Sequence, residues 1–380
     1  QNLSPGGPSA STPHVKGMET HPRDKAPSPT AETTTASAQD AESQPQTNQG
    51  GRWVIAMVGD LLFHKRLQRQ AYRARRGFLT IFEEFLPSLR AADITYGNLE
   101  GTIAPELTRL GRRVPGVGRT YDGVVYTAFP TFNYHRRLAK DLADAGFDVV
   151  STANNHGWDR RLPGALATLK ELASQGVAAT GTRASQSAPW HVIVERNGLR
   201  AAFIACAERS NLTPEVEGHL LMCGDGATVA ARITELVARS DVDVVLVTPH
   251  WGLQYRSTPT ATQQALGRRW IEAGATVVAG AHPHVLQPGE WVPRRDGSRG
   301  YIAYSLGNFC STMNRVPRRL TALLEVHLER QQNGDVALKH VTPIPGRMRL
   351  GHVPLQVLNL NERRRGEAHR QRVRAFFEPL

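Results

Sequence analysis

Short apolar segments alternate along this chain with segments that have the periodicity of amphipathic helices, and this alternation limits the fold more than any other feature. A continuous apolar run of strand length predicts a strand that is buried on both faces. Strands separated by helices are typical of an α/β domain with a largely parallel sheet. The predicted strands span residues 53–58, 92–96, 147–153, 177–180, 242–248, 275–278 and 301–306. The predicted helices span residues 78–90, 131–145, 163–174, 227–239 and 260–272, with basic helices within 61–76 and at 362–377.

Two Asn-Gly pairs mark connections of another kind. Asn197-Gly198 lies between apolar segments 190–195 and 199–205, and Asn333-Gly334 lies between segments 320–329 and 335–341. An Asn-Gly pair between two strands favours a tight antiparallel hairpin, because both residues tolerate positive φ angles. We therefore expect mixed sheets, with antiparallel strands added to a parallel core.

Residues 1–50 are rich in Ser, Thr, Pro, Ala, Gln and Gly and offer almost nothing to bury. We expect a disordered tail there, followed by a folded domain over 51–345 and a C-terminal extension over 346–380. Such a tail often separates an export signal or anchor from a folded domain; an interaction tail is the alternative. Because the chain begins with Gln1 and not Met, we expect an exported protein, periplasmic or associated with the cell envelope.

Basic residues outnumber acidic residues by 46 to 34, which gives a formal net charge of +12. A basic surface favours anionic partners. A genome that prefers arginine codons would give the same composition, so both interpretations stay open. No nucleic-acid-binding motif accompanies the arginines, and no nucleic-acid partner is expected.

The three cysteines, Cys206, Cys223 and Cys310, form no C-x-x-C pair. Their spacing argues against a zinc ribbon or a redox motif. One disulfide with one remaining thiol is compatible with the sequence, which does not identify the pair. No apolar run approaches the roughly 20 residues that a membrane-spanning helix needs.

The sequence His282-Pro283-His284 follows the apolar run 275–278. Pro283 fixes one φ angle and removes a backbone donor, so we expect a rigid strand end or turn here. Two histidines at i and i+2 on extended backbone point to the same side, and two such imidazoles make half of a metal site. Taken alone, the motif is more often a pair of polar loop histidines.

Five of the other predicted strands end in the same manner, with a carboxylate, amide or imidazole. In open α/β sheets, ligands bind outside the carboxyl ends of the strands. Each residue alone has another explanation: Asp60 as a helix cap, Asn154 as a turn residue, His250 as a packed histidine and Glu100 as a partner of an arginine. As a set without thiolates they suit Zn, Mn or Fe, and their number is enough for one or two ions. The residues at the strand ends are Asp60, Glu100, Asn155, His156, His250, His282, His284 and Asn308.

These residues lie in strings that resemble the CapA/PgsA family of bacterial capsule or poly-γ-glutamate synthesis proteins. The resemblance covers about residues 53–312, with the motifs in the family's order. The matching strings are Gly59-Asp60, Asn98-Leu99-Glu100, Asn154-Asn155-His156 through Asp159, His250-Trp251-Gly252, Gly280 through His284, and Tyr304 through Phe309. The family looks like a branch of the calcineurin-like metallophosphoesterases, which implies a four-layered α/β/β/α sandwich with the metal site at one edge.

The resemblance also implies roles for single residues. His156 would be the catalytic acid, and Asp159 would orient it or contact the substrate. Asn98, Asn154, Tyr304 and Asn308 would shape a substrate pocket. The implied ligands of divalent metal ions are Asp60, Glu100, Asn155, His250, His282 and His284.

The chain departs from the family pattern at three positions. Leu62 stands where the phosphoesterases have the histidine of Asp-x-His, and His64 is a partial substitute. Gln254 and Thr276 replace residues that are often acidic, and we expect both changes to remove negative charge close to the site.

Two functions are compatible with these features. The first is an exported metal-dependent hydrolase acting in the synthesis or export of an anionic extracellular polymer, on the polymer or its precursor. The second is a non-catalytic accessory of a membrane polymer-synthesis complex that binds anionic polymer. A nucleic-acid phosphodiesterase fits the chemistry but has no recognition motif. A serine hydrolase is disfavoured, because there is no G-x-S-x-G motif.

Overall fold

A computed structural model of the chain describes residues 51–213, 218–363 and 366–377. The tail predicted for residues 1–50 lies outside the described residues. Thr47–Leu380 form one structural unit. Its strands are β1 (Arg52–Leu61), β2 (Ile94–Leu99), β3 (Val149–Ser151), β4 (Ala178–Thr180), β5 (His191–Arg196), β6 (Leu199–Ala207), β7 (Val244–His250), β8 (Val277–Ala279), β9 (Leu286–Pro293), β10 (Arg299–Leu306), β11 (Leu320–Arg330), β12 (Val336–Arg349) and β13 (Gln356–Asn359). Its α-helices are α1 (Lys65–Arg73), α2 (Leu79–Phe82), α3 (Leu86–Ala91), α4 (Arg137–Ala145), α5 (Arg161–Ala173), α6 (Ala227–Val237), α7 (Ala261–Glu272) and α8 (Glu367–Arg374), with 3-10 turns η1 (Glu83–Phe85), η2 (Val316–Arg319) and η3 (Leu360–Glu362).

The strands form two mixed sheets. The seven-stranded sheet has the order β13-β12-β11-β1-β2-β3-β4, and the six-stranded sheet has the order β5-β6-β7-β8-β10-β9. β1 to β4 pair in parallel, as do β6, β7, β8 and β10. Both Asn-Gly hairpins are present as the antiparallel pairs β5–β6 and β11–β12. The prediction of a parallel core with antiparallel additions is confirmed.

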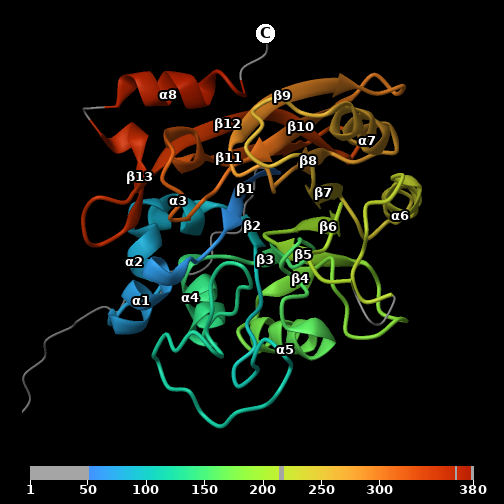
Figure 1. Cartoon of the computed structure of the whole chain (residues 1–380). Coiled ribbons are helices and arrows are strands. Elements are labelled where there is room, and N and C mark those ends of the chain that lie inside the picture. Colours follow the sequence, from blue (N-terminus) through green and yellow to red (C-terminus); the bar gives the residue numbers. More distant parts are fainter. Residues whose placement is uncertain (1–50, 214–217, 364–365, 378–380) are drawn as a thin grey trace, which may run out of the picture. The chain divides into compact units, whose positions relative to one another are not determined.

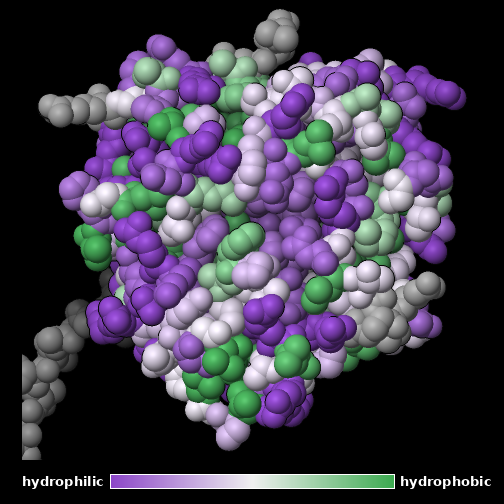
Figure 2. Space-filling view, viewed as in Figure 1, coloured by the Kyte–Doolittle hydropathy of each residue, from purple (hydrophilic) through white to green (hydrophobic). Residues whose placement is uncertain are grey.

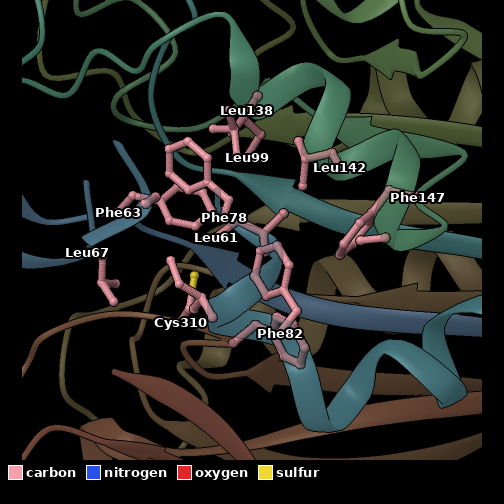
Figure 3. Packing of buried hydrophobic residues seen from close by; sticks show 14 of the residues in the cluster. Leu61, Phe63, Leu67, Phe78, Phe82, Leu99, Leu138, Leu142, Phe147 and Cys310 are labelled. Atoms are coloured by element: carbon pink, nitrogen blue, oxygen red, sulfur yellow. The ribbon is translucent and has the colours of Figure 1, made fainter. Parts of the chain in front are cut away.

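The two sheets pack face to face, with helices on both outer faces (Figure 1). Apolar side chains of both sheets meet between them, including Ile55 and Met57 of β1 with Phe203 of β6. Aromatic and aliphatic side chains from α1 to α4 cover the outer face of the seven-stranded sheet, as the labelled Phe78 and Phe82 show (Figure 3). Residues of α6 and α7 cover the six-stranded sheet. This is the expected four-layered α/β/β/α sandwich.

Two predicted helices differ from those observed. The helix predicted over 78–90 is broken into α2, η1 and α3, because Pro87 lies in the first turn of α3 and cannot continue a preceding helix. The helix predicted from residue 131 begins at Arg137. Asn133 pairs instead with Thr127 and Thr102 in isolated bridges, and its side-chain amide donates to Ala104 and Val125 carbonyl oxygens.

The C-terminal residues are part of the sandwich and not a separate extension. The boundary predicted at 345/346 falls inside β12, which continues to Arg349 and pairs with β13. The basic helix α8 follows, and its Val373 is buried with the apolar residues between the sheets. The sequence places the end of the domain too early, because the prolines of β12 interrupt the residue pattern that predicts a strand.

Cys206 and Cys223 form a disulfide, and Cys310 is a buried free thiol. The bridge joins the end of β6 to the loop that precedes α6. Among the described residues, no helix is long and apolar enough to cross a membrane.

Candidate metal centre

The carboxyl ends of the parallel strands of both sheets meet at one edge of the sandwich. Leu61 at the end of β1 bridges to Cys310 beyond β10, and His250 at the end of β7 bridges to Ala281 beyond β8. Figure 2 shows hydrophilic residues gathered across the middle of the face onto which these ends open. The predicted convergence of the strand ends is present.

Gly59 sets the position of the first ligand. The register between β1 and β2 shifts between Val58 and Asp60, so the strand bulges there. A Cβ atom at Gly59 would lie 2.0 Å from the carbonyl oxygen of Gly307, and the amide of Asp60 donates to that oxygen over 3.0 Å. A bulge beside a site re-aims a side chain, and here it turns the Asp60 carboxylate inward.

Asp60 lies in a buried polar network. Its Oδ1 accepts a hydrogen bond from Nδ2 of Asn98 at 2.8 Å, and its Oδ2 lies 3.0 Å from Nδ1 of His284. The same His284 nitrogen lies 2.9 Å from Oδ1 of Asn308. Asn154 donates to Oδ1 of Asn98 at 3.3 Å. These hydrogen bonds of Asn98, Asn154 and Asn308 therefore hold the Asp60 carboxylate and the His284 ring in place.

A second set of donor atoms converges beside the first. Nε2 of His250 lies 2.8 Å from Oδ1 of Asn155 and 3.1 Å from Nδ1 of His282. All three side chains are buried. One amide oxygen and two imidazole nitrogens this close together form a set that suits a borderline divalent ion.

Glu100 lies between the two sets. Its Oε1 is 3.8 Å from Nε2 of His284 and 3.9 Å from Nε2 of His250. Both carboxylate oxygens are fully buried and have no hydrogen-bond partner among the residues that the structure describes. A buried carboxylate without donors is costly, and a bound cation removes that cost. Atoms of Asp60, Glu100 and His284 lie within 4.8 Å of one another, so the residues fit a metal ion.

The backbone at His282 and His284 forms a turn, one of the two conformations predicted, and not the extended strand from which a shared direction of the two rings was expected. Their φ angles are 99° and 57°, values that residues other than glycine rarely adopt. Contacts hold the turn in place: the amide of Tyr255 donates to the Pro283 carbonyl oxygen at 2.7 Å. The two rings nevertheless face the same centre, with centroids 6.0 Å apart. The expected pairing of the imidazoles is present, but strained backbone and not strand alternation produces it.

His156 lies at the side of the centre and contacts three residues. Its Nδ1 is 2.7 Å from Oδ2 of Asp159, and its ring meets that of Phe132 edge-on at 4.7 Å. Nδ2 of Asn211 lies 3.3 Å from Nδ1, and Oδ1 of Asn211 accepts from Nδ2 of Asn155 at 3.2 Å. Asp159 thus contacts the ring of His156, and its role in orienting the ring stays a prediction.

Asn211 was missed by the sequence interpretation. It lies in the loop after β6, and the rule that polar residues follow strand ends applies to it as to the others. In the same loop Glu208 accepts a hydrogen bond from the amide of Gly252, which follows β7. Because Asn211 lies several residues beyond the apolar segment 199–205, the sequence pattern does not mark it as a residue at a strand end.

Four further residues singled out in the sequence have different locations. His64 lies close enough to His284 and His156 for their charges to lower its pKa, which burial and these charges bring to about 4. Gln254 is exposed beside Tyr255. Thr276 lies at the opposite, amino end of β8, so the expected loss of charge near the site is wrong for this position. The Tyr304 hydroxyl donates to Glu290 at 2.6 Å and its ring packs beside Trp251 under α7, so none of these contacts joins it to the donor cluster, and its role in a substrate pocket stays a prediction.

The ionisation of the buried groups favours metal binding. Burial lowers the pKa of His282 to about 4 and that of His250 well below its usual value, so both rings are neutral at neutral pH and able to coordinate a cation. Burial raises the pKa of Glu100 to about 7. Burial alone would lower the pKa of His284, but the charges of Glu100 and Asp60 outweigh it and raise the value to about 9.

Metal loading is therefore expected to release a proton from His284. Because its pKa is raised to about 9, the metal-free ring is protonated at pH 8, and Nε2 must lose its proton to become a ligand. Affinity should rise as pH increases towards 9 and then level off. Calorimetry of metal binding at pH 8, in buffers with different ionisation enthalpies, measures the number of protons released. Heats that do not depend on the buffer would contradict this assignment.

The fold and the site together define a class of protein: a four-layered sandwich with a cluster of buried oxygen and nitrogen donors at one edge of its sheets. Residues 54–313 match the family model of the bacterial capsule synthesis protein PGA_cap, and the chain belongs to this family. It is 28% identical over 293 residues to the PGA biosynthesis protein CapA of Bacillus subtilis, covering 76% of this chain and 70% of that protein. It is 26% identical over 295 residues to the capsule biosynthesis protein CapA of Bacillus anthracis, covering 76% of this chain and 66% of that protein.

Similarities to solved structures are more distant. NAD nucleotidase of Haemophilus influenzae aligns with a TM-score of 0.42 and 10% identity, over 86% of this chain and 63% of that one. A Staphylococcus aureus protein described as a 5′-nucleotidase aligns with a TM-score of 0.46 and 11% identity, over 85% and 58% of the two chains. Such similarities carry no argument about the activity of this chain.

Proposed function

We propose that this capsule-synthesis-family protein is a metal-dependent hydrolase that cleaves phosphoester-like or amide bonds in an anionic extracellular polymer or its precursor. The observation that carries the proposal is the Glu100 carboxylate, which is buried between two sets of O/N donors and accepts no hydrogen bond from the described residues. A protein that only needed a packed core there would place an apolar residue at this position.

The donor atoms divide into two groups that share Glu100. Asp60 and His284 form one group, and Asn155, His250 and His282 form the other. Oxygen and imidazole donors without thiolate suit Mn, Zn or Fe, as one ion or two. A divalent ion bound there supplies Lewis acidity and lowers the pKa of a coordinated water. The protein itself supplies these donors at a buried site, where the donor groups are neutral or anionic.

His156 is the proposed proton donor to the leaving group. Asp159 holds Nδ1 at 2.7 Å, whereas Nε2 has only a long contact of 3.4 Å with Nδ2 of Asn211, so Nε2 is the nitrogen proposed to exchange a proton with a substrate. Asn211 contacts both His156 and Asn155 and so links the position of the acid to that of a ligand. Asn154 supports the same turn, because its Oδ1 accepts from the backbone amide of His156 at 3.1 Å.

The proposed setting is the outside of the cell membrane, in the periplasm or cell envelope, in contact with a membrane polymer-synthesis complex. The Cys206–Cys223 disulfide supports this setting, because disulfides persist in oxidising compartments. Fractionation of cells that make the protein tests the location, and recovery from the cytosol with all three thiols reduced would contradict it.

Elemental analysis tests the metal proposal directly. Wild-type protein incubated with Mn²⁺, Zn²⁺ or Fe²⁺ and then desalted is expected to retain at least one equivalent of one of these metals. His282→Ala removes a ligand from the second group and should retain markedly less, whereas His191→Ala, on β5 away from the site, should equal wild type. Wild-type protein that retains no metal under any of these conditions would refute a catalytic centre.

A non-catalytic accessory that binds anionic polymer is the second candidate. Basic side chains of α1 favour this function, because none of them forms an ion pair with a carboxylate of the described residues. This observation does not depend on the metal centre. Polymer binding without any hydrolysis by metal-loaded protein would select this function.

A further inference from the structure

The outward face of α1 carries a row of arginines. The helix buries Leu67, Gln68, Ala71 and Tyr72 against the core. On the opposite side Arg66, Arg69 and Arg73 follow one another at intervals of three and four residues, so they share one face. The part of Figure 2 that α1 occupies in Figure 1 is largely hydrophilic.

Among the described residues, no carboxylate neutralises these arginines. In the part of the chain that the structure describes, none of the three guanidinium groups forms an ion pair with a carboxylate. Nη2 of Arg66 donates to the carbonyl oxygen of Leu350 at 3.1 Å, and Arg69 lies 5.5 Å from the ring centre of Tyr121. The carboxylate of Glu83 is already paired with Arg76. Uncompensated cations at a surface attract anions.

The arginines line a cavity with a volume of about 470 Å³. Its other wall is the loop Val353-Pro354-Leu355. Gln70 fixes this loop against the helix, because its Nε2 donates to the Leu355 carbonyl oxygen at 2.9 Å and its Oε1 accepts from the Leu355 amide at 2.6 Å. The cavity is thus a formed groove between α1 and a tethered loop.

The amino end of α1, and not the lining of the cavity itself, lies next to the metal centre. His64 immediately precedes α1, and its Nδ1 accepts from the amide of Thr312 at 3.4 Å. Its ring meets Phe132 edge-on at 5.3 Å, and Phe132 in turn meets His156 at 4.7 Å. A chain lying along α1 therefore points towards the proposed acid at one end.

We propose that this groove binds a segment of an anionic polymer that carries regularly spaced carboxylates and directs it to the metal centre. The choice of polymer rests on the proposed function, whereas the anionic character rests on the arginines. The three arginines span about 10 Å of helix, which is too long for one small anion to bridge. In an extended chain, side groups on one side repeat every ~6.6 Å, which is somewhat longer than the axial steps of about 4.5 and 6 Å between the arginines, and the long arginine side chains span the difference.

The groove favours a polycarboxylate over a single-stranded nucleic acid. Nucleic-acid grooves combine cations with aromatic side chains on which bases stack. Here the wall opposite the arginines is aliphatic, with Val353 exposed, and Lys65 and Arg69 lie over the ring of Tyr121.

Fluorescence anisotropy with labelled poly-glutamate tests the proposal on the full chain. The triple variant Arg66→Gln, Arg69→Gln, Arg73→Gln should bind roughly tenfold or more weakly at low salt and show a smaller salt dependence. The matched control Arg232→Gln, Arg295→Gln, Arg372→Gln removes the same charge from exposed positions elsewhere and should bind within about twofold of wild type. Equal weakening by both triple variants would refute the groove, because net charge alone would then explain binding.

Two further measurements keep the result specific. Gln70→Leu leaves the charge unchanged but frees the loop at Leu355, and it should weaken poly-glutamate binding several-fold with little change in salt dependence. Oligo-dT of equal charge or anionic lipid vesicles, if bound more tightly than poly-glutamate through the same arginines, would overturn the assignment to a polycarboxylate. Wild-type protein stripped of metal with a chelator should bind poly-glutamate as the metal-loaded protein does, so failure of the groove and failure of the metal centre are separable.

Discussion

Glu100→Gln is expected to abolish metal retention and, in the absence of metal, to stabilise the fold. The Glu100 carboxylate lies between the two donor groups, so replacing it with a neutral amide removes a negative charge that both groups share. We expect the variant to retain less than about a tenth of the metal that wild type retains. The metal-free variant should be more stable by about 1 kcal/mol, because a buried group without hydrogen-bond donors costs about 1–3 kcal/mol and an amide is cheaper to bury than a carboxylate.

The order of stability should therefore reverse on adding metal. Wild type gains about 2.7 kcal/mol when the free metal is at a hundred times its dissociation constant, whereas the variant gains little. Urea unfolding of both proteins, with chelator and with metal, gives the four free energies. Glu195→Gln is the matched control, since its side chain is exposed on β5 and should change neither quantity. A variant that holds metal like wild type, or that is destabilised without metal, would show that Glu100 has a structural role only.

The strand ends could be predicted from the sequence, because the rule that places them is local. An apolar run followed by Asp60 or by Asn155-His156 shows both the strand and its end, and parallel strands bring their carboxyl ends to one edge. The same rule, applied to the amino end, would have excluded Thr276 from the site. Strand alternation also separates Tyr304, which faces α7 as Ile302 does, from the residues that face the other sheet.

The remaining features depend on contacts between distant segments. The positive φ angles of His282 and His284 are held by neighbours such as Tyr255, which no local pattern reveals. Asn211 reaches His156 through a loop whose path is fixed by the Cys206–Cys223 bridge and by Glu208. The prolines of β12 made its second half unrecognisable, although the strand continues there on the edge that pairs with β13.

His156→Ala is expected to separate chemistry from metal binding. The ring contacts Asp159, Phe132 and Asn211, and among the described contacts none joins it to Asp60, Glu100 or His284 at hydrogen-bond distance. The variant should therefore retain as much metal as wild type. Hydrolysis of a chromogenic phosphodiester, or of whichever ester or amide a screen finds, should fall roughly 10²- to 10⁴-fold, the usual contribution of a general acid.

The pattern across variants distinguishes the two functions. Asn211→Ala should lower turnover less than His156→Ala, because it loosens the acid without removing it, and its metal content should fall slightly through the lost contact with Asn155. His191→Ala should match wild type in both measurements. If metal-loaded wild type hydrolyses a substrate and His156→Ala does so equally well, His156 is not the acid. If metal-loaded wild type hydrolyses nothing while it binds polymer through α1, the strand ends hold a metal for structure, and the chain serves polymer synthesis by binding alone.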